Sequence, residues 1–142
     1  MPVESRAEAT WNGDLMIGSG HVQPASGAFP DLQLTWRQRA DSRESGTSPE
    51  ELIAAAHAAC FSMALSHGLA QAGHTAEQVE TTATVAFQAG QGITGIRLSV
   101  RGRVPGLDAA GFRQAAEGAK ENCPVSKALA GVQITLDEAE LA

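Results

Sequence analysis

Two cysteines, Cys60 and Cys123, are the residues of this 142-residue chain best suited to chemistry. A thiolate can attack the O–O bond of a peroxide and become a sulfenic acid, which a second thiol can convert into a disulfide. This chemistry needs two cysteines that can meet and a cation that keeps the first one ionised. Free cysteines are also common as small buried apolar residues, so two cysteines alone leave both interpretations open.

The two thiols differ in their expected environments. Cys123 precedes Pro124 at a predicted helix start, a position that lowers the pKa of a thiol. Cys60 lies deep within a predicted apolar helix, where burial would raise its pKa. For Cys60 to act as a thiolate, an arginine must reach it from another element. Arg37 and Arg39 are the obvious donors, although each would also suit a solvated strand face.

Glu50 and Glu51 lie at the start of the same predicted helix, where carboxylates suit the helix dipole. Glu50 precedes Cys60 by ten residues. That separation is about 15 Å along a helix, so the two side chains cannot touch within one straight helix. Glu50 could still orient an arginine beside Cys60, either if the first turn bends away or if Glu50 comes from a second subunit.

A metal site is a competing interpretation of the same residues. His57 and Cys60 are three positions apart and share a helix face. Cys123 and one further histidine could complete a four-ligand zinc site. Zinc ligands usually come in close pairs, and no second pair is present. We therefore expect no metal and interpret His57 as a core or interface histidine bonded to the backbone. The further histidines are His21, His67 and His74.

Composition excludes several classes of function. The net charge is −6 with no run of lysine or arginine, which argues against nucleic-acid binding. The chain is 43% apolar and 18% charged, as is ordinary for a soluble globule, and its length predicts a single domain spanning 1–142. His57 and Ser62 interrupt the longest apolar run, so we expect no membrane span. The N-terminus has no signal-peptide pattern, which predicts a cytoplasmic protein.

The segment that must position Cys60 is a predicted helix starting near Thr47. Thr47 and Ser48 are capping residue types, and Pro49 is tolerated at a first helical position. From Leu52 to Leu65 only two residues are polar. A helix this apolar is normally buried on nearly all sides. Since one sheet covers only one face, the pattern favours a second copy of the chain on the other.

The remaining elements follow from hydrophobic periodicity and turn residues. The predicted order is β-β-β-α-β-β-α-β, which favours a mixed or antiparallel α+β domain over a doubly wound parallel one. Arg37 and Arg39 would share one face of the third strand, before a polar loop over 40–46. The predicted strands span 7–11, 16–22, 32–39, 79–88, 96–103 and 132–136; the predicted helices span 47–73 and 108–122, with a short helix from Pro124.

Two cysteine motifs carry a family resemblance. The stretch 47–65 (TSPEELIAAAHAACFSMAL) and the stretch 122–129 (NCPVSKAL), followed by 134–136, resemble the OsmC/Ohr family of bacterial thiol peroxidases. The stretches 9–14 and 105–108 resemble the family's opening hairpin and its approach to the second helix. The resemblance covers nearly the whole chain and is closer to the osmotically inducible OsmC branch than to the organic hydroperoxide resistance (Ohr) branch.

The resemblance implies an α+β, OsmC-like fold: an antiparallel or mixed sheet packed on two main helices, in an intertwined homodimer with central helices. It also implies that Cys60 is the peroxidatic thiol and Cys123 the resolving thiol. The activating arginine is matched best by Arg39, while Arg37 stays possible because the loop 40–46 differs in length. Glu50 matches the motif's glutamate and is expected to orient Arg39 across the subunit boundary.

The implied activity is that of a thiol-dependent peroxidase without a cofactor. It would reduce organic hydroperoxides and hydrogen peroxide through a Cys60 sulfenic acid and a Cys60–Cys123 disulfide, in defence against oxidative and osmotic stress. An external dithiol would regenerate the enzyme; in the family this is often a lipoyl-bearing protein. The alternatives are a non-enzymatic thiol redox sensor or binding domain and, third, a zinc-binding module.

Overall fold

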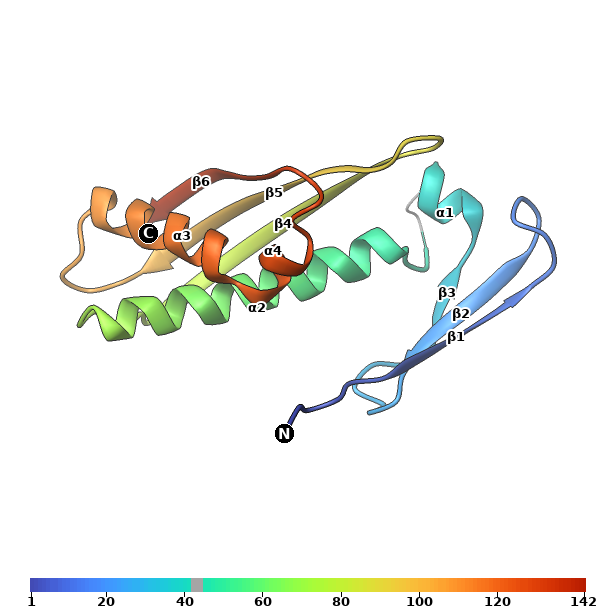
Figure 1. Ribbon diagram of the computed structural model, residues 1–142, viewed down its shortest axis with the longest axis horizontal. Coiled ribbons are helices and arrows are strands. Elements are labelled where there is room, and N and C mark those ends of the chain that lie inside the picture. Colours follow the sequence, from blue (N-terminus) through green and yellow to red (C-terminus); the bar gives the residue numbers. More distant parts are fainter. Residues whose placement is uncertain (42–44) are drawn as a thin grey trace. The chain divides into compact units, whose positions relative to one another are not determined.

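A computed structural model describes residues 1–41 and 45–142 of the chain (Figure 1). The middle of the predicted polar loop 40–46 therefore lies outside the described residues. The chain divides into two compact units, Met1–Leu52 and Ile53–Ala142. We call them the N-terminal unit and the C-terminal unit, and each is described by itself.

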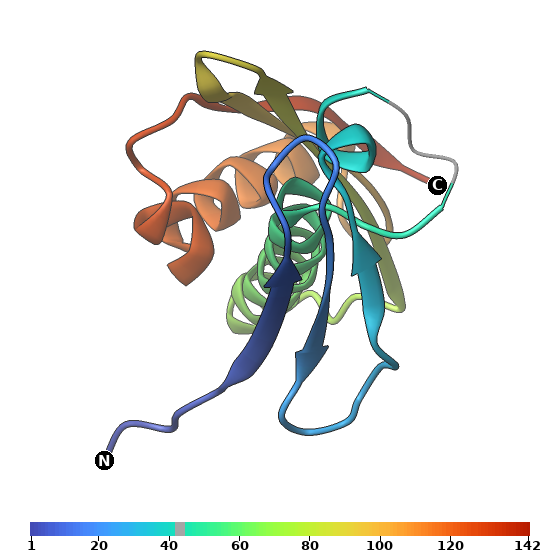
Figure 2. The same ribbon diagram turned by 90° about the vertical axis from the view of Figure 1, so that its right-hand side faces the viewer.

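The N-terminal unit is built on a three-stranded antiparallel sheet. Its strands β1 (Ala7–Asn12), β2 (Ser19–Pro24) and β3 (Leu32–Leu34) lie in the order β1-β2-β3, as Figure 2 shows. Gly13 follows β1 with φ at 91°, a conformation that glycine adopts without strain. The predicted hairpin is thus confirmed, although β2 begins three residues later than the predicted strand 16–22.

The third strand is shorter than the alternation of residues 32–39 predicts. It ends at Leu34, and a short helix α1 (Trp36–Ala40) begins there. The hydroxyl of Thr35 caps this helix by accepting a hydrogen bond from the backbone N–H of Gln38 at 3.1 Å. The capping hydrogen bond from Thr35 is thus favoured here over the backbone hydrogen bonds that would continue strand β3. The prediction that Arg37 and Arg39 project from a strand face is wrong, because both lie on α1.

The C-terminal unit has a second three-stranded sheet, in the order β4-β5-β6. Strands β4 (Gln78–Gln88) and β5 (Gly92–Arg103) are antiparallel, and β6 (Ile134–Leu141) pairs in parallel with β5. Most of α2 (Pro49–Gln71) and α3 (Ala109–Asn122) cover one face of this sheet (Figure 1). The short helix α4 (Pro124–Ala128) follows α3. The predicted mixed α+β architecture is confirmed.

The buried apolar core of the described residues lies entirely in the C-terminal unit. Gly102 on β5 allows the Phe112 ring of α3 to approach closely, since a Cβ at position 102 would lie 2.7 Å from it. Asp108 caps α3, as predicted, by accepting from the backbone N–H of Gly111. The core residues are Phe61, Leu65, Leu69, Ile96, Leu98, Val100, Val104, Phe112, Ala116, Ala119, Cys123 and Leu136.

Helix α2 is less buried in the single chain than its composition predicts. Phe61 and Leu65 face the core, but Met63 is 74% exposed and Ala55 and Ala59 are also exposed. By length and mean hydropathy alone α2 could cross a bilayer, so excluding a span because polar residues interrupt the run was too strict. Core helices of soluble proteins share this property, and the buried His57 suits a packed helix.

Candidate active site

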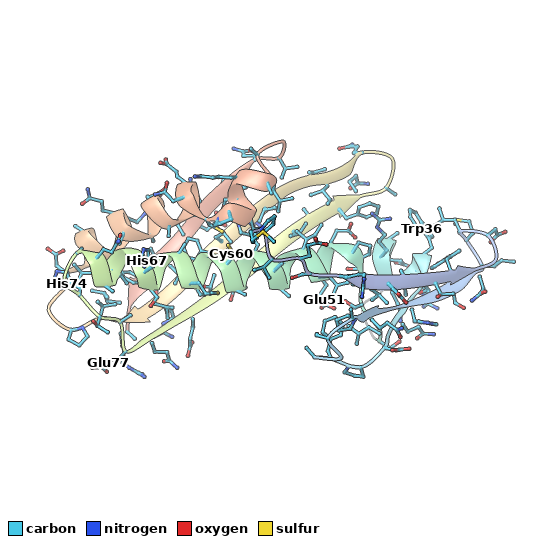
Figure 3. All side chains as sticks on the ribbon, turned by 60° about the horizontal axis from the view of Figure 1, so that its bottom comes forward. Trp36, Glu51, Cys60, His67, His74 and Glu77 are labelled. Atoms are coloured by element: carbon cyan, nitrogen blue, oxygen red, sulfur yellow. The ribbon has the colours of Figure 1, made fainter. Side chains whose placement is uncertain are left out.

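The two cysteines meet within the C-terminal unit. Cys60 lies midway along α2 (Figure 3), and Cys123 is the N-cap residue of α4. Both are free thiols; Cys123 is fully buried and Cys60 is half-buried. The two thiols lie close enough to interact, and each shifts the pKa of the other. The first requirement of the two-thiol chemistry is therefore met within one chain.

The interaction between the two thiols separates their acidities. Burial raises the pKa of Cys60, and the interaction with Cys123 raises it further. Burial also acts to raise the pKa of Cys123, but interactions with Cys60 and with Ser126 and Val125 at the start of α4 lower it below its ordinary value. Within this unit Cys123 is the more acidic thiol, as the helix-start argument predicts, so Cys60 needs a cation from elsewhere.

Arg39 and Glu50 form a two-pronged ion pair within the N-terminal unit. Arg39 Nε donates to Glu50 Oε1 at 3.1 Å, and Arg39 Nη2 donates to Glu50 Oε2 at 3.0 Å. The Glu50 side chain is only 2% exposed, whereas that of Arg39 is 35% exposed. Paired donation to a buried carboxylate fixes the plane of the guanidinium. The Arg39 side chain is therefore oriented by Glu50 and remains partly exposed.

This pair corrects one expectation from the sequence. Glu50 was predicted to orient Arg39 across a subunit boundary, but the structure forms the pair inside one chain. The reason is α1, which turns Arg39 toward the first turn of α2. Arg37 lies on the exposed side of α1 and forms no ion pair within residues 1–41 and 45–142. The local geometry thus favours Arg39 over Arg37.

An apolar pocket of about 180 Å³ adjoins Arg39 in the N-terminal unit. Two indole rings contribute to its wall, and the Arg39 side chain contributes the positive charge. The residue pattern did not predict this pocket, because Leu34 and Trp36 fit one face of a half-buried strand. The other lining residues are Trp11, Leu15, Thr35 and Pro49. A ligand with an uncharged organic group next to an electron-rich oxygen would suit these apolar walls and the positive charge of Arg39.

A larger groove of about 660 Å³ runs between α2 and α3 in the C-terminal unit. Small residues such as Ala64, Gly68 and Gly118 line it, and it ends at Pro124, next to Cys123. Neither lysine nor arginine is among its lining residues. The cationic side chains that line this groove could therefore come only from its histidines, His67 and His74.

His57 is fully buried and bonds to a side chain rather than to the backbone as predicted. Its Nε2 lies 2.7 Å from the Oγ of Ser126 on α4. Burial lowers the pKa of His57, so its imidazole is neutral near pH 7. Sequence reasoning missed Ser126. The available signal was its spacing, since Ser126 follows Cys123 by three residues just as Cys60 follows His57.

Within the described residues, no group of three or more histidine, cysteine or acidic side chains is arranged to hold a metal ion. The Nε2 atom of His57, the natural ligand in the proposed zinc alternative, is already bonded to Ser126. The Cys60 and Cys123 thiols interact with each other. These contacts give the zinc interpretation no support.

A sequence model described as "OsmC-like protein" matches residues 41–137. This chain belongs to the OsmC family. It is 44% identical to "Peroxiredoxin OsmC" of Escherichia coli (strain K12) over 140 residues, which are 96% of each chain. It is 36% identical to "Organic hydroperoxide resistance protein OhrA" of Bacillus subtilis over 115 residues, or 78% of this chain and 79% of that one.

The OsmC-family fold is also found by structural comparison. The crystal structure of the organic hydroperoxide resistance protein OhrB of Bacillus subtilis matches with a TM-score of 0.68 and 29% identity, covering 96% of this chain and 98% of that chain. The higher identity to the OsmC relative than to the Ohr relative confirms the branch that the cysteine motifs indicate.

Proposed function

We propose that this protein is a cysteine-based peroxidase that reduces hydroperoxides, with Cys60 as the peroxidatic thiol and Cys123 as the resolving thiol. The observation that carries the proposal is that these two thiols lie close enough within one unit to shift each other's pKa. Two relatives, named "Peroxiredoxin OsmC" and "Organic hydroperoxide resistance protein OhrA", support the same chemistry. The enzyme needs no cofactor, since sulfur supplies and accepts the electrons.

The first step oxidises Cys60. Arg39 approaches Cys60 and stabilises its thiolate, while Glu50 holds the guanidinium in place. The thiolate attacks the terminal oxygen of the hydroperoxide, the O–O bond breaks, and the released alkoxide takes a proton and leaves as alcohol. Cys60 is then a sulfenic acid. A guanidinium acts well here because it favours the anionic sulfur and the charge that develops on the leaving oxygen.

The second step joins the two sulfurs. Cys123 attacks the sulfur of the Cys60 sulfenic acid and displaces hydroxide, which leaves as water after taking a proton. The product is the Cys60–Cys123 disulfide. An external dithiol then reduces it by thiol–disulfide exchange, and a lipoyl-bearing protein is the reductant we propose. Cys123 suits its role because its pKa is lowered, so it attacks as a thiolate.

The pocket beside Arg39 supports organic hydroperoxides as substrates. Its volume of about 180 Å³ and its two tryptophans suit a small alkyl or aryl group, with the peroxide oxygens directed toward the guanidinium. Hydrogen peroxide would bind without filling the pocket. We therefore propose that the enzyme accepts both substrates and prefers the organic one, as part of oxidative and osmotic stress defence.

We further propose that the protein works as a homodimer in the cytoplasm, with residues 1–142 acting as one domain. The N-terminal unit contributes no fully buried apolar residue to the described core. Leu15, Met16 and Ile17 at the β1–β2 turn are exposed, as is Met63 on α2. These apolar surfaces would be covered by a second copy of the chain, which also accounts for the apolar composition of α2.

The decisive experiment measures steady-state consumption of an alkyl hydroperoxide and of hydrogen peroxide, with dihydrolipoamide as the reductant. The wild-type protein should turn over many times and prefer the alkyl hydroperoxide. Cys60→Ser should abolish turnover, and Cys123→Ser should allow a single oxidation. Multiple turnovers by the Cys60→Ser protein would refute the proposal. A wild-type protein that oxidises once and stops would indicate a redox sensor instead.

A further inference from the structure

A row of four polar side chains joins α2 to α4 in the C-terminal unit. His57 and Cys60 are one helical turn apart on α2, and Cys123 and Ser126 are one turn apart at the start of α4. The two pairs face each other: His57 Nε2 lies 2.7 Å from Ser126 Oγ, and the Cys60 thiol interacts with the Cys123 thiol. Ser126 also interacts with the Cys123 sulfur, which closes the row.

The position of the proton on the His57 ring sets the direction of the hydrogen bonds in this row. Within the described residues, His57 Nδ1 is buried and has no hydrogen-bond partner. A buried N–H without an acceptor is rarer in proteins than an unused acceptor, so the proton belongs on Nε2. Nε2–H then donates to Ser126 Oγ. Because that oxygen is already accepting, its own proton is free to be donated to the Cys123 sulfur.

We propose that His57 and Ser126 are positioning residues for disulfide formation: neutral His57 donates to Ser126, and Ser126 donates to Cys123 and holds its sulfur as a thiolate facing Cys60. The inference rests on the proposed function and concerns its second step, the formation of the Cys60–Cys123 disulfide. His57 acts only through Ser126, whereas Ser126 touches the reacting sulfur. Neither residue exchanges electrons or changes its net protonation state.

The step balances without any further reactant. A lone pair of the Cys123 thiolate forms the S–S bond, and the S–O bonding pair leaves Cys60 with the hydroxide ion. The hydroxide takes one proton from solvent and departs as water. Since the donated hydrogen bonds act on the Cys123 sulfur, their removal should slow disulfide formation far more than it slows the oxidation of Cys60 by peroxide. The inference therefore separates the two half-reactions.

The experiment compares two variants that delete a donor with two that keep one. Ser126→Ala and His57→Leu remove a donor, whereas Ser126→Thr keeps the hydroxyl and His57→Gln keeps an N–H. A matched control is Ser62→Ala, which deletes a 2.7 Å hydrogen bond from α2 to Thr81 on β4 that does not involve the thiols. All variants are first checked for folding by circular dichroism.

Two readouts are taken on folded protein. The first is the pKa of Cys123, titrated by thiolate absorbance in a Cys60→Ser background. The second is the rate of disulfide formation after one equivalent of hydroperoxide, with the rate of Cys60 oxidation recorded in the same trace. Removing a donor should raise the pKa of Cys123 by about one unit and slow disulfide formation roughly tenfold. Effects of this size are expected when one charge-assisted hydrogen bond is lost.

The pattern across variants decides the matter. We expect Ser126→Thr and His57→Gln to restore most of the resolving rate, and Ser62→Ala to leave both readouts unchanged. An unchanged pKa and resolving rate in Ser126→Ala and His57→Leu would overturn the inference. A His57→Gln protein that forms the disulfide as slowly as His57→Leu would also overturn the inference. The N–H kept by Gln would then not be enough, and His57 would be needed to accept a proton.

Failure of this inference is distinguishable from failure of the proposed function. If the wild type turns over and depends on both cysteines while the donor-deleted variants resolve normally, only the positioning role is lost. If the Cys60→Ser protein keeps multiple turnovers, the peroxidase proposal itself fails. If Ser126→Ala does not fold, the comparison of His57→Leu with His57→Gln carries the test alone.

Discussion

The two units of the chain carry different groups of the candidate site on different kinds of structure. The C-terminal unit holds both thiols against a packed core of aromatic and aliphatic residues, with Cys123 itself fully buried. The N-terminal unit holds the Arg39–Glu50 pair, with Arg39 on α1 and Glu50 in the first turn of α2, and it adds no residue to that described core. The two thiols therefore belong to the unit with the packed core, and the guanidinium that we propose to activate Cys60 belongs to the other unit.

This division has an electrostatic consequence. By itself the C-terminal unit favours Cys123 as the thiolate, since burial raises the pKa of Cys60 while the start of α4 lowers that of Cys123. Only a cation from elsewhere can reverse the order in favour of Cys60. We propose that Arg39, in the N-terminal unit, supplies this cation. Peroxidase activity should then depend on the Arg39 guanidinium as well as on the two thiols.

The largest expected effect concerns the core on which the thiols are mounted. Phe112→Ala should lower the free energy of unfolding by about 3–5 kcal/mol, because it opens a cavity under α3 and β5. Phe29→Ala, the same change at a 37% exposed position in the N-terminal unit, should cost within about 0.5 kcal/mol. Chemical denaturation measures both, and equal costs would contradict the contrast between the units.

The second effect concerns the arginine. Arg39→Ala should lower kcat/KM for an alkyl hydroperoxide roughly 10²–10³-fold, because the pKa of Cys60 would stay raised and the leaving oxygen would lose its stabilising charge. Arg37→Ala is the matched control, since Arg37 lies on the same short helix but on its exposed side, and should change little. The reverse ranking of the two variants would assign the role to Arg37.

The smallest effect concerns the pocket in the N-terminal unit. Trp36→Ala should raise KM for a bulky aryl hydroperoxide about tenfold, because it removes one indole wall beside Arg39. The rate with hydrogen peroxide should hardly change, since that substrate has no group to fill the pocket. Phe29→Ala again serves as the control. An equal loss with both substrates would show that Trp36 supports Arg39 rather than the organic group.

Local sequence signals predicted the elements well wherever a cap or a period was decisive. Ser48 accepts from the backbone N–H of Glu51 at the start of α2, and Asp108 caps α3, as their residue types indicate. Cys123 stands at the N-cap of α4, with Pro124 as its first residue. The α1 helix was missed because alternating residues 32–36 outweighed the single cap residue Thr35 in the sequence pattern.

The candidate site was likewise predicted only in part from the sequence. Residue types and spacing singled out Cys60, Cys123, Arg39 and Glu50 before any coordinates, with family resemblance choosing among them. Ser126 and the pocket beside Arg39 were not found. His57 and Ser126 are 69 positions apart, and the pocket collects residues from the first hairpin, α1 and the start of α2. Nothing in a one-dimensional pattern reports such neighbours.

The amino-acid sequence by itself determined where α2, α3 and α4 start and which strands form hairpins, because caps, turns and periodicity act over a few residues. The two cysteine motifs carried the family resemblance, and with it the expected thiol chemistry. The tertiary structure alone decided that the thiols lie close enough to interact, that Arg39 is clamped by Glu50 within one chain, and that His57 bonds to Ser126. These contacts depend on how helices pack, and packing is set by the summed burial of many distant side chains.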